Sequence, residues 1–167
     1  MSYRPLLALI AAITLPAAAQ DVTLIHAGEL LAVPGKAPMQ QMTIIVEDNR
    51  ITGVQQGFVE SAGANVIDLS DKFVLPGLMD MHVHLQGQLG PTNDRDRLKM
   101  SSQLMQMRSL HYAMNTLLAG FTTVRDVGSS EQEMYAMRDA IAAGWVDGPR
   151  IVAAGGVGIT GGHADIS

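Results

Sequence analysis

The sequence contains no cysteine, which excludes disulfide bonds and thiolate metal ligands. Any metal that the chain binds must therefore use nitrogen and oxygen ligands. The charged residues form no block of one sign, and the formal net charge is −5 over 167 residues. This composition favours neither a nucleic-acid surface nor an electrostatic membrane patch. The length is sufficient for a domain with a sizeable core.

The first 19 residues have the pattern of a signal peptide. Arg4 supplies a positive start, residues 6–15 are largely apolar, and residues 17–19 are three alanines. Signal peptidases accept small residues at such a site, and the apolar run is shorter than the roughly 20 residues that span a bilayer. We therefore predict cleavage near Ala19 and export, to the periplasm or out of the cell, with no stable membrane insertion afterwards.

Residues 20–72 have the pattern of short strands joined by polar turns. A tight turn is expected at residues 27–29, and a second at residues 47–50. Strands are expected at residues 22–26, 30–33, 42–46, 51–54 and 66–69. This pattern predicts a small antiparallel sheet that forms part of an N-terminal β-sandwich.

From residue 73 to residue 167, strands alternate with helices. Helical spacing of apolar residues covers residues 98–118, and Gly120 suits the end of that helix. Ser130 and Glu133 form a capping box for a second helix that ends near Gly144. The alternation predicts a parallel sheet with right-handed crossovers. Three such strands would leave a sheet edge and face uncovered, so we expect the front part of a larger protein or a truncated reading frame.

The first strand of this second part has one polar and one apolar face, and we expect it to be buried. Asp80, His82 and His84 alternate with the apolar residues Met79, Met81, Val83 and Leu85. Successive side chains of a strand point to opposite faces, so the three polar groups are expected to share one face. Two imidazoles at this spacing can bind one divalent ion, which predicts His82 and His84 as metal ligands. Asp80 either orients a ligand histidine or is a strand-end carboxylate bonded to backbone amides.

Three motifs follow one another along the chain, at residues 74–85, 119–128 and 148–155. Together they resemble the amidohydrolase superfamily, in particular its imidazolonepropionase-like and Xaa-Pro or Xaa-basic dipeptidase-like branch. The resemblance implies an α/β protein with a small N-terminal β-sandwich and a metal-dependent TIM-like barrel, of which this chain holds the first three β/α units. It also implies one or two divalent ions, often zinc, bound through His82 and His84, and hydrolysis of amide or peptide C–N bonds.

Members of this superfamily complete the site with residues on later strands: a lysine or glutamate, two further histidines and a late aspartate. The sequence up to Ser167 does not supply that set. The catalytic residues are therefore expected beyond Ser167, and residues 1–167 alone are expected to be inactive. His163 follows the third barrel strand and is expected to face a small-molecule or dipeptide substrate; the alternative is a loop histidine that serves the turn. The sequence leaves the substrate and the oligomeric state open.

Two other functions are compatible with parts of the sequence. Gly156, Gly158 and Gly161 match the dinucleotide fingerprint of oxidoreductases. That fingerprint needs a helix opening at the loop and an acidic residue about 20 residues later, and it leaves the two histidines unexplained. The other alternative is a non-catalytic exported β-rich module or a pseudoenzyme, which the missing later ligands favour.

Overall fold

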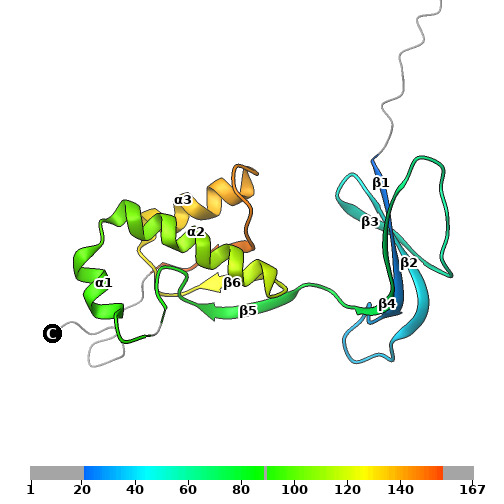
Figure 1. Ribbon diagram of the computed structural model, residues 1–167, viewed down its shortest axis with the longest axis horizontal. Coiled ribbons are helices and arrows are strands. Elements are labelled where there is room, and N and C mark those ends of the chain that lie inside the picture. The colour runs from blue at the N-terminus through cyan, green and yellow to red at the C-terminus, as the bar shows by residue number, and fades with distance from the viewer. Residues whose placement is uncertain (1–20, 89, 156–167) are drawn as a thin grey trace, which may run out of the picture. The chain divides into compact units, whose positions relative to one another are not determined.

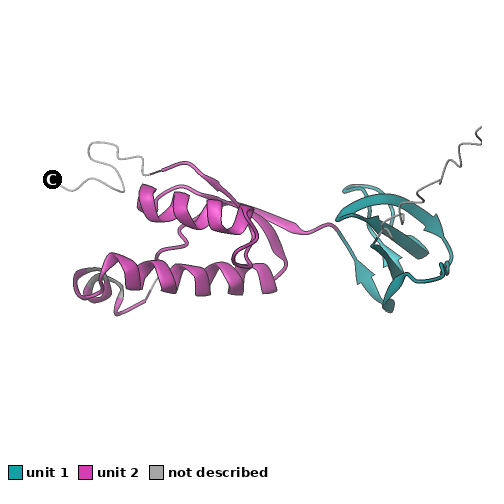
Figure 2. Cartoon of the chain, turned by 90° about the horizontal axis from the view of Figure 1, so that it is seen from above, with its two compact units in different colours: residues 1–75 teal, residues 76–167 magenta. Residues whose placement is uncertain are grey.

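The computed structural model describes residues 21–88 and 90–155. The chain is a mixed α/β protein that divides into two compact units, Met1–Leu75 and Pro76–Ser167, coloured teal and magenta in Figure 2. The predicted signal peptide, residues 1–19, lies outside the described residues. Among the helices that the structure describes, none is both long enough and apolar enough to cross a bilayer.

The first unit contains one mixed sheet of four strands (Figure 1). The strands are β1 (Val22–Leu30), β2 (Met39–Glu47), β3 (Arg50–Gln56) and β4 (Asn65–Val74), and their order is β3-β2-β1-β4. β2 pairs antiparallel with both β1 and β3, whereas β4 pairs parallel with β1. The expected small sheet is present, but the expectation that it is antiparallel throughout is wrong. The described residues of this unit form a single sheet layer, so the second layer of a sandwich is not among them.

Gly28 lies inside a strand and not in the turn that we expected at residues 27–29. β1 runs without interruption from Val22 to Leu30. A Cβ atom at residue 28 would lie 2.3 Å from the carbonyl oxygen of Ser70 on the neighbouring strand. The register between β1 and β4 also shifts between Ala27 and Glu29. Glycine therefore permits a close backbone approach at an irregular pairing, a common reason for glycine within a strand.

The expected turn between β2 and β3 is confirmed. Asp48 and Asn49 have φ angles of 49° and 62°. Two-residue hairpin turns with positive φ at both positions favour asparagine and aspartate, which tolerate the left-handed region. Behind this hairpin, a small core holds the sheet together, formed by Ala27, Leu30, Met42 and Ile44.

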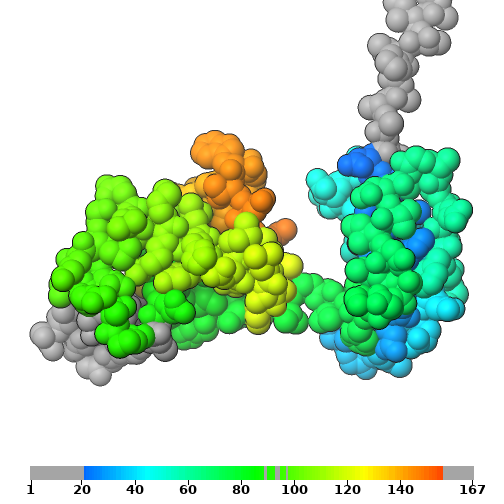
Figure 3. Space-filling view, viewed as in Figure 1, coloured from blue at the N-terminus to red at the C-terminus, as the bar shows by residue number. Residues whose placement is uncertain are grey.

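The second unit is a three-stranded parallel sheet with two helices packed on one face. Its elements are β5 (Leu78–Val83), α1 (Asn93–Lys99), α2 (Ser102–Leu118), β6 (Phe121–Asp126), α3 (Glu131–Ala142) and β7 (Arg150–Ala153). The strand order is β5-β6-β7, and both neighbouring pairs are parallel, as the alternation predicts. The buried core under α2 and α3 consists of Leu85, Ala113, Val124, Met134, Met137 and Ile151. α1 and α2 form much of the visible surface of this unit in Figure 3.

The single helix expected at residues 98–118 is in fact two helices. α1 ends at Lys99, and Met100 and Ser101 have extended backbone angles. The Ser101 hydroxyl accepts a hydrogen bond from the backbone N–H of Leu104 at 3.2 Å, which makes Ser101 the N-cap of α2. The end of α2 is as expected, because Gly120 has a φ of 97°, which suits glycine.

The start of α3 lies where the capping box predicts it, but its contacts differ. Ser130 is the N-cap, yet its hydroxyl donates to the carboxylate of Glu133 instead of accepting from the backbone. This hydrogen bond, with a smaller contribution from a backbone bond, lowers the pKa of the Glu133 carboxyl below its ordinary value of 4.5. Gly144, with a φ of 71°, follows the C-terminal end of the helix, as expected.

Candidate metal centre

The carboxyl ends of β5, β6 and β7 meet at one edge of the parallel sheet, and the two predicted metal ligands lie there. His82 is the penultimate residue of β5, and His84 follows its last residue. Val83 and Leu85, on either side of His84, pack in the core beneath the helices. His84 thus lies between two residues that belong to that core.

The imidazoles of His82 and His84 lie next to each other, with ring centroids 5.5 Å apart and ring planes at 52°. Both side chains are exposed. Two imidazoles that bind one tetrahedral zinc ion at 2.0–2.1 Å would have ring centroids about 5 Å apart. The observed spacing therefore fits a shared divalent ion, and neutral ring nitrogens are ligands that zinc accepts. These two residues lie together as the strand pattern predicts.

The rest of the strand departs from the regular alternation that we expected. Asp80 is in register with Val124 of β6, whereas Val83 is in register with Asp126. Three steps along β5 thus match two steps along β6, which is the signature of a bulge. Met79 and Met81 are 68 % and 50 % exposed. The expectation of a buried strand is therefore wrong, and the pairing of β5 with β6 is irregular between Asp80 and Val83.

Asp80 makes a contact with the backbone, which corresponds to the second of its two predicted roles. Its Oδ1 atom accepts a hydrogen bond from the backbone N–H of His82 at 3.0 Å, and its side chain is half-buried. Within residues 21–88 and 90–155, no three His, Cys, Asp or Glu side chains group closely enough to hold a metal ion. Asp80 therefore does not join the two imidazoles in a three-ligand group.

Asp126, at the end of β6, is a residue of this region that we did not single out from the sequence. Its side chain is buried, with 1 % of its surface exposed. Its Oδ2 accepts from the backbone N–H of Leu85 at 2.7 Å and from the Ser129 hydroxyl at 2.7 Å. Its Oδ1 accepts from the backbone N–H groups of Ser129, at 2.9 Å, and Gly128, at 3.2 Å. The only sequence signal was its place within the motif at residues 119–128.

Gly128 lies directly against the imidazole of His84. A Cβ atom at residue 128 would be 2.3 Å from Cε1 and 2.4 Å from Nδ1 of that ring. Real Cβ atoms essentially never show contacts under 3.0 Å. The loop after β6 therefore leaves room for the ring only because residue 128 has no side chain.

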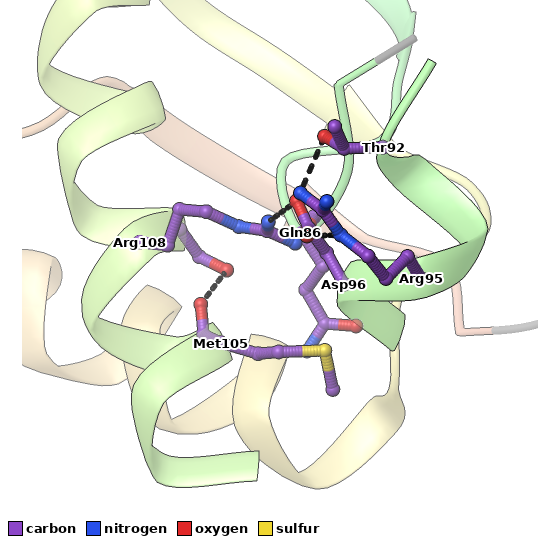
Figure 4. Close-up of polar contacts among 7 residues, drawn as sticks. Gln86, Thr92, Arg95, Asp96, Met105 and Arg108 are labelled. Carbon is purple, nitrogen blue, oxygen red and sulfur yellow. Dashed lines mark hydrogen bonds and ion pairs between the residues drawn. The ribbon is translucent and has the colours of Figure 1, made fainter. Parts of the chain in front are cut away.

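A polar network fixes the loop that follows the two histidines (Figure 4). The Gln86 side-chain oxygen accepts from the backbone N–H of Ser130 at 2.6 Å, and its backbone oxygen accepts from Arg108 Nη2 at 3.3 Å. Arg108 Nη1 in turn donates to Asp96 Oδ2 at 3.2 Å, and the Thr92 hydroxyl donates to the same oxygen at 3.1 Å. The loop after β5 is thereby connected to α1, to α2 and to the start of α3.

The structure does not describe the remaining residues with a predicted role. His163 and the glycines Gly156, Gly158 and Gly161 lie outside the described residues, so their expected roles stay predictions. His26 belongs to the first unit, where its Nε2 atom is 2.9 Å from the Val59 carbonyl oxygen and its ring stacks on Phe58. These contacts give His26 a structural role.

Sequence comparison identifies the second unit. A sequence model described as the amidohydrolase family matches residues 73–160. The chain is 42 % identical over 53 residues to a dihydroorotase of Trichlorobacter lovleyi. This match covers 32 % of the chain and 12 % of the dihydroorotase. It is 27 % identical over 105 residues to an enamidase of Eubacterium barkeri. This match covers 61 % of the chain and 24 % of the enamidase.

Structure comparison gives a longer match. The chain resembles a crystal structure of a Xaa-Pro dipeptidase with methionine bound in its active site, with a TM-score of 0.78 and 39 % sequence identity. This match covers 87 % of the chain and 36 % of the dipeptidase. The chain thus spans between about an eighth and about a third of the lengths of these relatives.

Proposed function

The chain belongs to the amidohydrolase family, and from this premise we propose that it is part of a metal-dependent hydrolase of amide or peptide C–N bonds. His82 and His84 would supply the first two ligands of a divalent ion, and we propose zinc, which is among the ions that imidazole donors suit. The observation that carries the proposal is the 5.5 Å spacing of the two rings at the carboxyl end of a parallel strand. Active sites of β/α barrels are built at that end of the strands.

Such an ion, when bound, lowers the pKa of a coordinated water and polarises a substrate carbonyl group. The residues of this chain would contribute by orientation. The backbone at His82 is fixed by the Asp80 carboxylate, and the ring of His84 rests against Gly128. Two imidazoles are fewer than the three protein ligands usual for catalytic zinc. We therefore expect residues 1–167 alone to bind metal weakly and to lack hydrolase activity.

The architecture that we propose has two parts. The second unit would be the first three β/α units of a TIM-like barrel, and the first unit would be part of a β-sandwich. The parallel order β5-β6-β7 and the similarity to the dipeptidase structure support this arrangement.

The substrate class that we propose is a dipeptide or another small amide. A similarity at 39 % identity over 87 % of the chain is to a Xaa-Pro dipeptidase, which favours a peptide substrate over that of a dihydroorotase. The pattern of residues 1–19 adds the proposal that the protein is exported, to the periplasm or beyond, where peptides are available substrates. N-terminal sequencing of the protein from its native host would test this, since an N-terminus at Met1 or Ser2 would contradict export by cleavage.

The test of the hydrolase function uses the natural full-length protein. Metal-free protein is titrated with Co²⁺, whose visible absorption reports ligand geometry, and Zn²⁺-loaded protein is assayed on Xaa-Pro dipeptides. His82→Ala and His84→Ala should each weaken Co²⁺ binding strongly, to an affinity that is still measurable, and should abolish hydrolysis. His111→Ala, which removes an exposed histidine on α2, is the matched control and should leave both unchanged.

Two results would contradict the proposal. If neither histidine variant affected Co²⁺ binding, the metal would bind at a site that does not include these histidines. A full-length protein that binds no metal and hydrolyses no amide would favour the non-catalytic alternative.

A further inference from the structure

The buried carboxylate of Asp126 connects two segments that are far apart in the sequence. One of its hydrogen bonds reaches Leu85, 41 residues earlier in the chain, in the loop that follows β5. The other three reach Gly128 and Ser129 in the loop after β6. A buried carboxylate is costly unless its oxygens are hydrogen-bonded, and four donors fill the acceptor sites of both oxygens. The group is thus held in one orientation.

Both segments that Asp126 fixes are in contact with His84. Leu85 is the next residue, so the bond to its N–H fixes the peptide group that leaves His84. Gly128 is the residue against which the imidazole rests, and its N–H donates to the same carboxylate. The backbone after His84 and the surface beneath its ring are therefore set by one side chain, although Asp126 is not itself among the proposed ligands.

From this arrangement we infer that Asp126 is a positioning residue, which holds the His84 imidazole in the orientation that binds the metal. The inference rests on the proposed metal-binding role of His84. Groups that orient a ligand histidine commonly change metal affinity about 10- to 100-fold when they are removed. Their usual contact is with the second ring nitrogen, whereas Asp126 acts on the backbone and on the loop under the ring.

Asp126→Asn is the informative variant because it removes some of the four hydrogen bonds that Asp126 accepts and leaves the others in place. The amide nitrogen of asparagine cannot accept a hydrogen bond. If it replaces Oδ2, the Ser129 hydroxyl can rotate and act as the acceptor, but the Leu85 N–H loses its partner. If it replaces Oδ1, two backbone N–H groups lose theirs. The first orientation costs less, so the variant should release the peptide group next to His84.

Ser129→Ala is the matched control. It removes one hydrogen bond from the same carboxylate and leaves the bond to Leu85 intact. In the full-length protein, Asp126→Asn should lower Co²⁺ affinity at least about 10-fold and change the visible spectrum of the bound Co²⁺. Ser129→Ala should change the affinity less than about 2-fold and leave the spectrum unchanged, by the same reasoning.

A double-variant cycle decides whether Asp126 acts through His84. When His84 is already alanine, Asp126→Asn should have no further effect on Co²⁺ affinity. If the same loss persists in the His84→Ala background, the effect arises from the lost negative charge or from general destabilisation, and the inference is wrong. An unchanged spectrum and affinity in Asp126→Asn alone would also overturn it. If instead His84→Ala itself leaves Co²⁺ binding unchanged, the proposed metal site fails, which is a distinct result.

Circular dichroism should show that Asp126→Asn folds. If the variant does not fold, hydrogen exchange at the Leu85 amide of the metal-free natural protein tests the inference instead. The inference requires this amide to be protected before metal is added, because Asp126 holds it in the absence of the ion. Rapid exchange that slows only on Co²⁺ addition would contradict the inference.

Discussion

The imidazole of His84 rests on the α-carbon of Gly128, with a distance of only 2.3 Å between the ring atom Cε1 and the position that a Cβ of residue 128 would occupy. His84 follows β5, and Gly128 follows β6. The contact therefore joins a predicted metal ligand to a loop that contributes no metal ligand in our proposal. Any side chain at residue 128 must therefore move the ring or the loop.

Gly128→Ala should impair metal binding more than folding. The φ angle of Gly128 is not in the left-handed region, so alanine meets no backbone strain, and the exposed ring can move away. We expect Co²⁺ affinity of the full-length protein to fall about 10-fold, and the free energy of unfolding to change by less than about 1 kcal/mol. Gly90→Ala is the control, since a Cβ there meets no atom within 4 Å. Equal Co²⁺ affinities of the two variants would argue against this contact.

Arg108→Lys should destabilise the loop after the histidines. The guanidinium group reaches both Asp96 and the Gln86 backbone oxygen, and a lysine ammonium cannot reproduce that planar pair of donors. We expect the free energy of unfolding, measured in urea, to fall by about 1–2 kcal/mol. Arg138→Lys keeps the charge in an exposed ion pair with Asp139, which solvent screens, and should cost clearly less. A cost for Arg108→Lys as small as for the control would show that the network adds nothing to stability.

Thr43→Val should destabilise the first unit through an unpaired amide. The fully buried Thr43 hydroxyl donates to the Gly57 carbonyl oxygen at 2.7 Å and accepts from the Val59 N–H at 3.1 Å. Valine keeps the shape but leaves both groups without this partner, for an expected loss of about 1–3 kcal/mol in urea unfolding. Thr43→Ser keeps the hydroxyl and loses one methyl group, for about 1 kcal/mol. The prediction fails if serine is as harmful as valine.

Glu133→Gln should remove a pH-dependent part of the stability. The Ser130 hydroxyl bond lowers the pKa of Glu133 in the folded state, so the folded protein favours the charged carboxylate. This contribution is present above the ordinary pKa of 4.5 and is lost as the pH falls through the lower, folded-state pKa. The difference in melting temperature between the natural protein and the variant should therefore narrow as the pH falls below the ordinary pKa of 4.5. Ser130→Ala should produce the same narrowing, and a difference that grows on acidification would contradict the assignment.

Local features of the fold were predictable because a few neighbouring residues decide them. Asp48 and Asn49 form the turn expected of them, and Gly120 and Gly144 follow helix ends. The spacing of His82 and His84 likewise follows from two residues of extended backbone. Gly28 shows the limit of this local reasoning. A glycine between apolar runs predicts a turn, but it also permits the close approach of a distant strand, here at Ser70, 42 residues later in the chain.

Pairings between distant segments decided what the local pattern could not. The parallel return of β4 beside β1, the irregular pairing between Asp80 and Val83, and the bond from Leu85 to Asp126 all depend on which segments meet. Register and burial are properties of a pair of strands, so one strand's own pattern does not contain them. The sequence alone determined the family and the two candidate ligand residues. Only the tertiary structure showed that the buried Asp126 carboxylate bonds to the peptide group after His84 and that Gly128 lies against the His84 ring, because these contacts exist only once the ends of β5 and β6 are packed side by side.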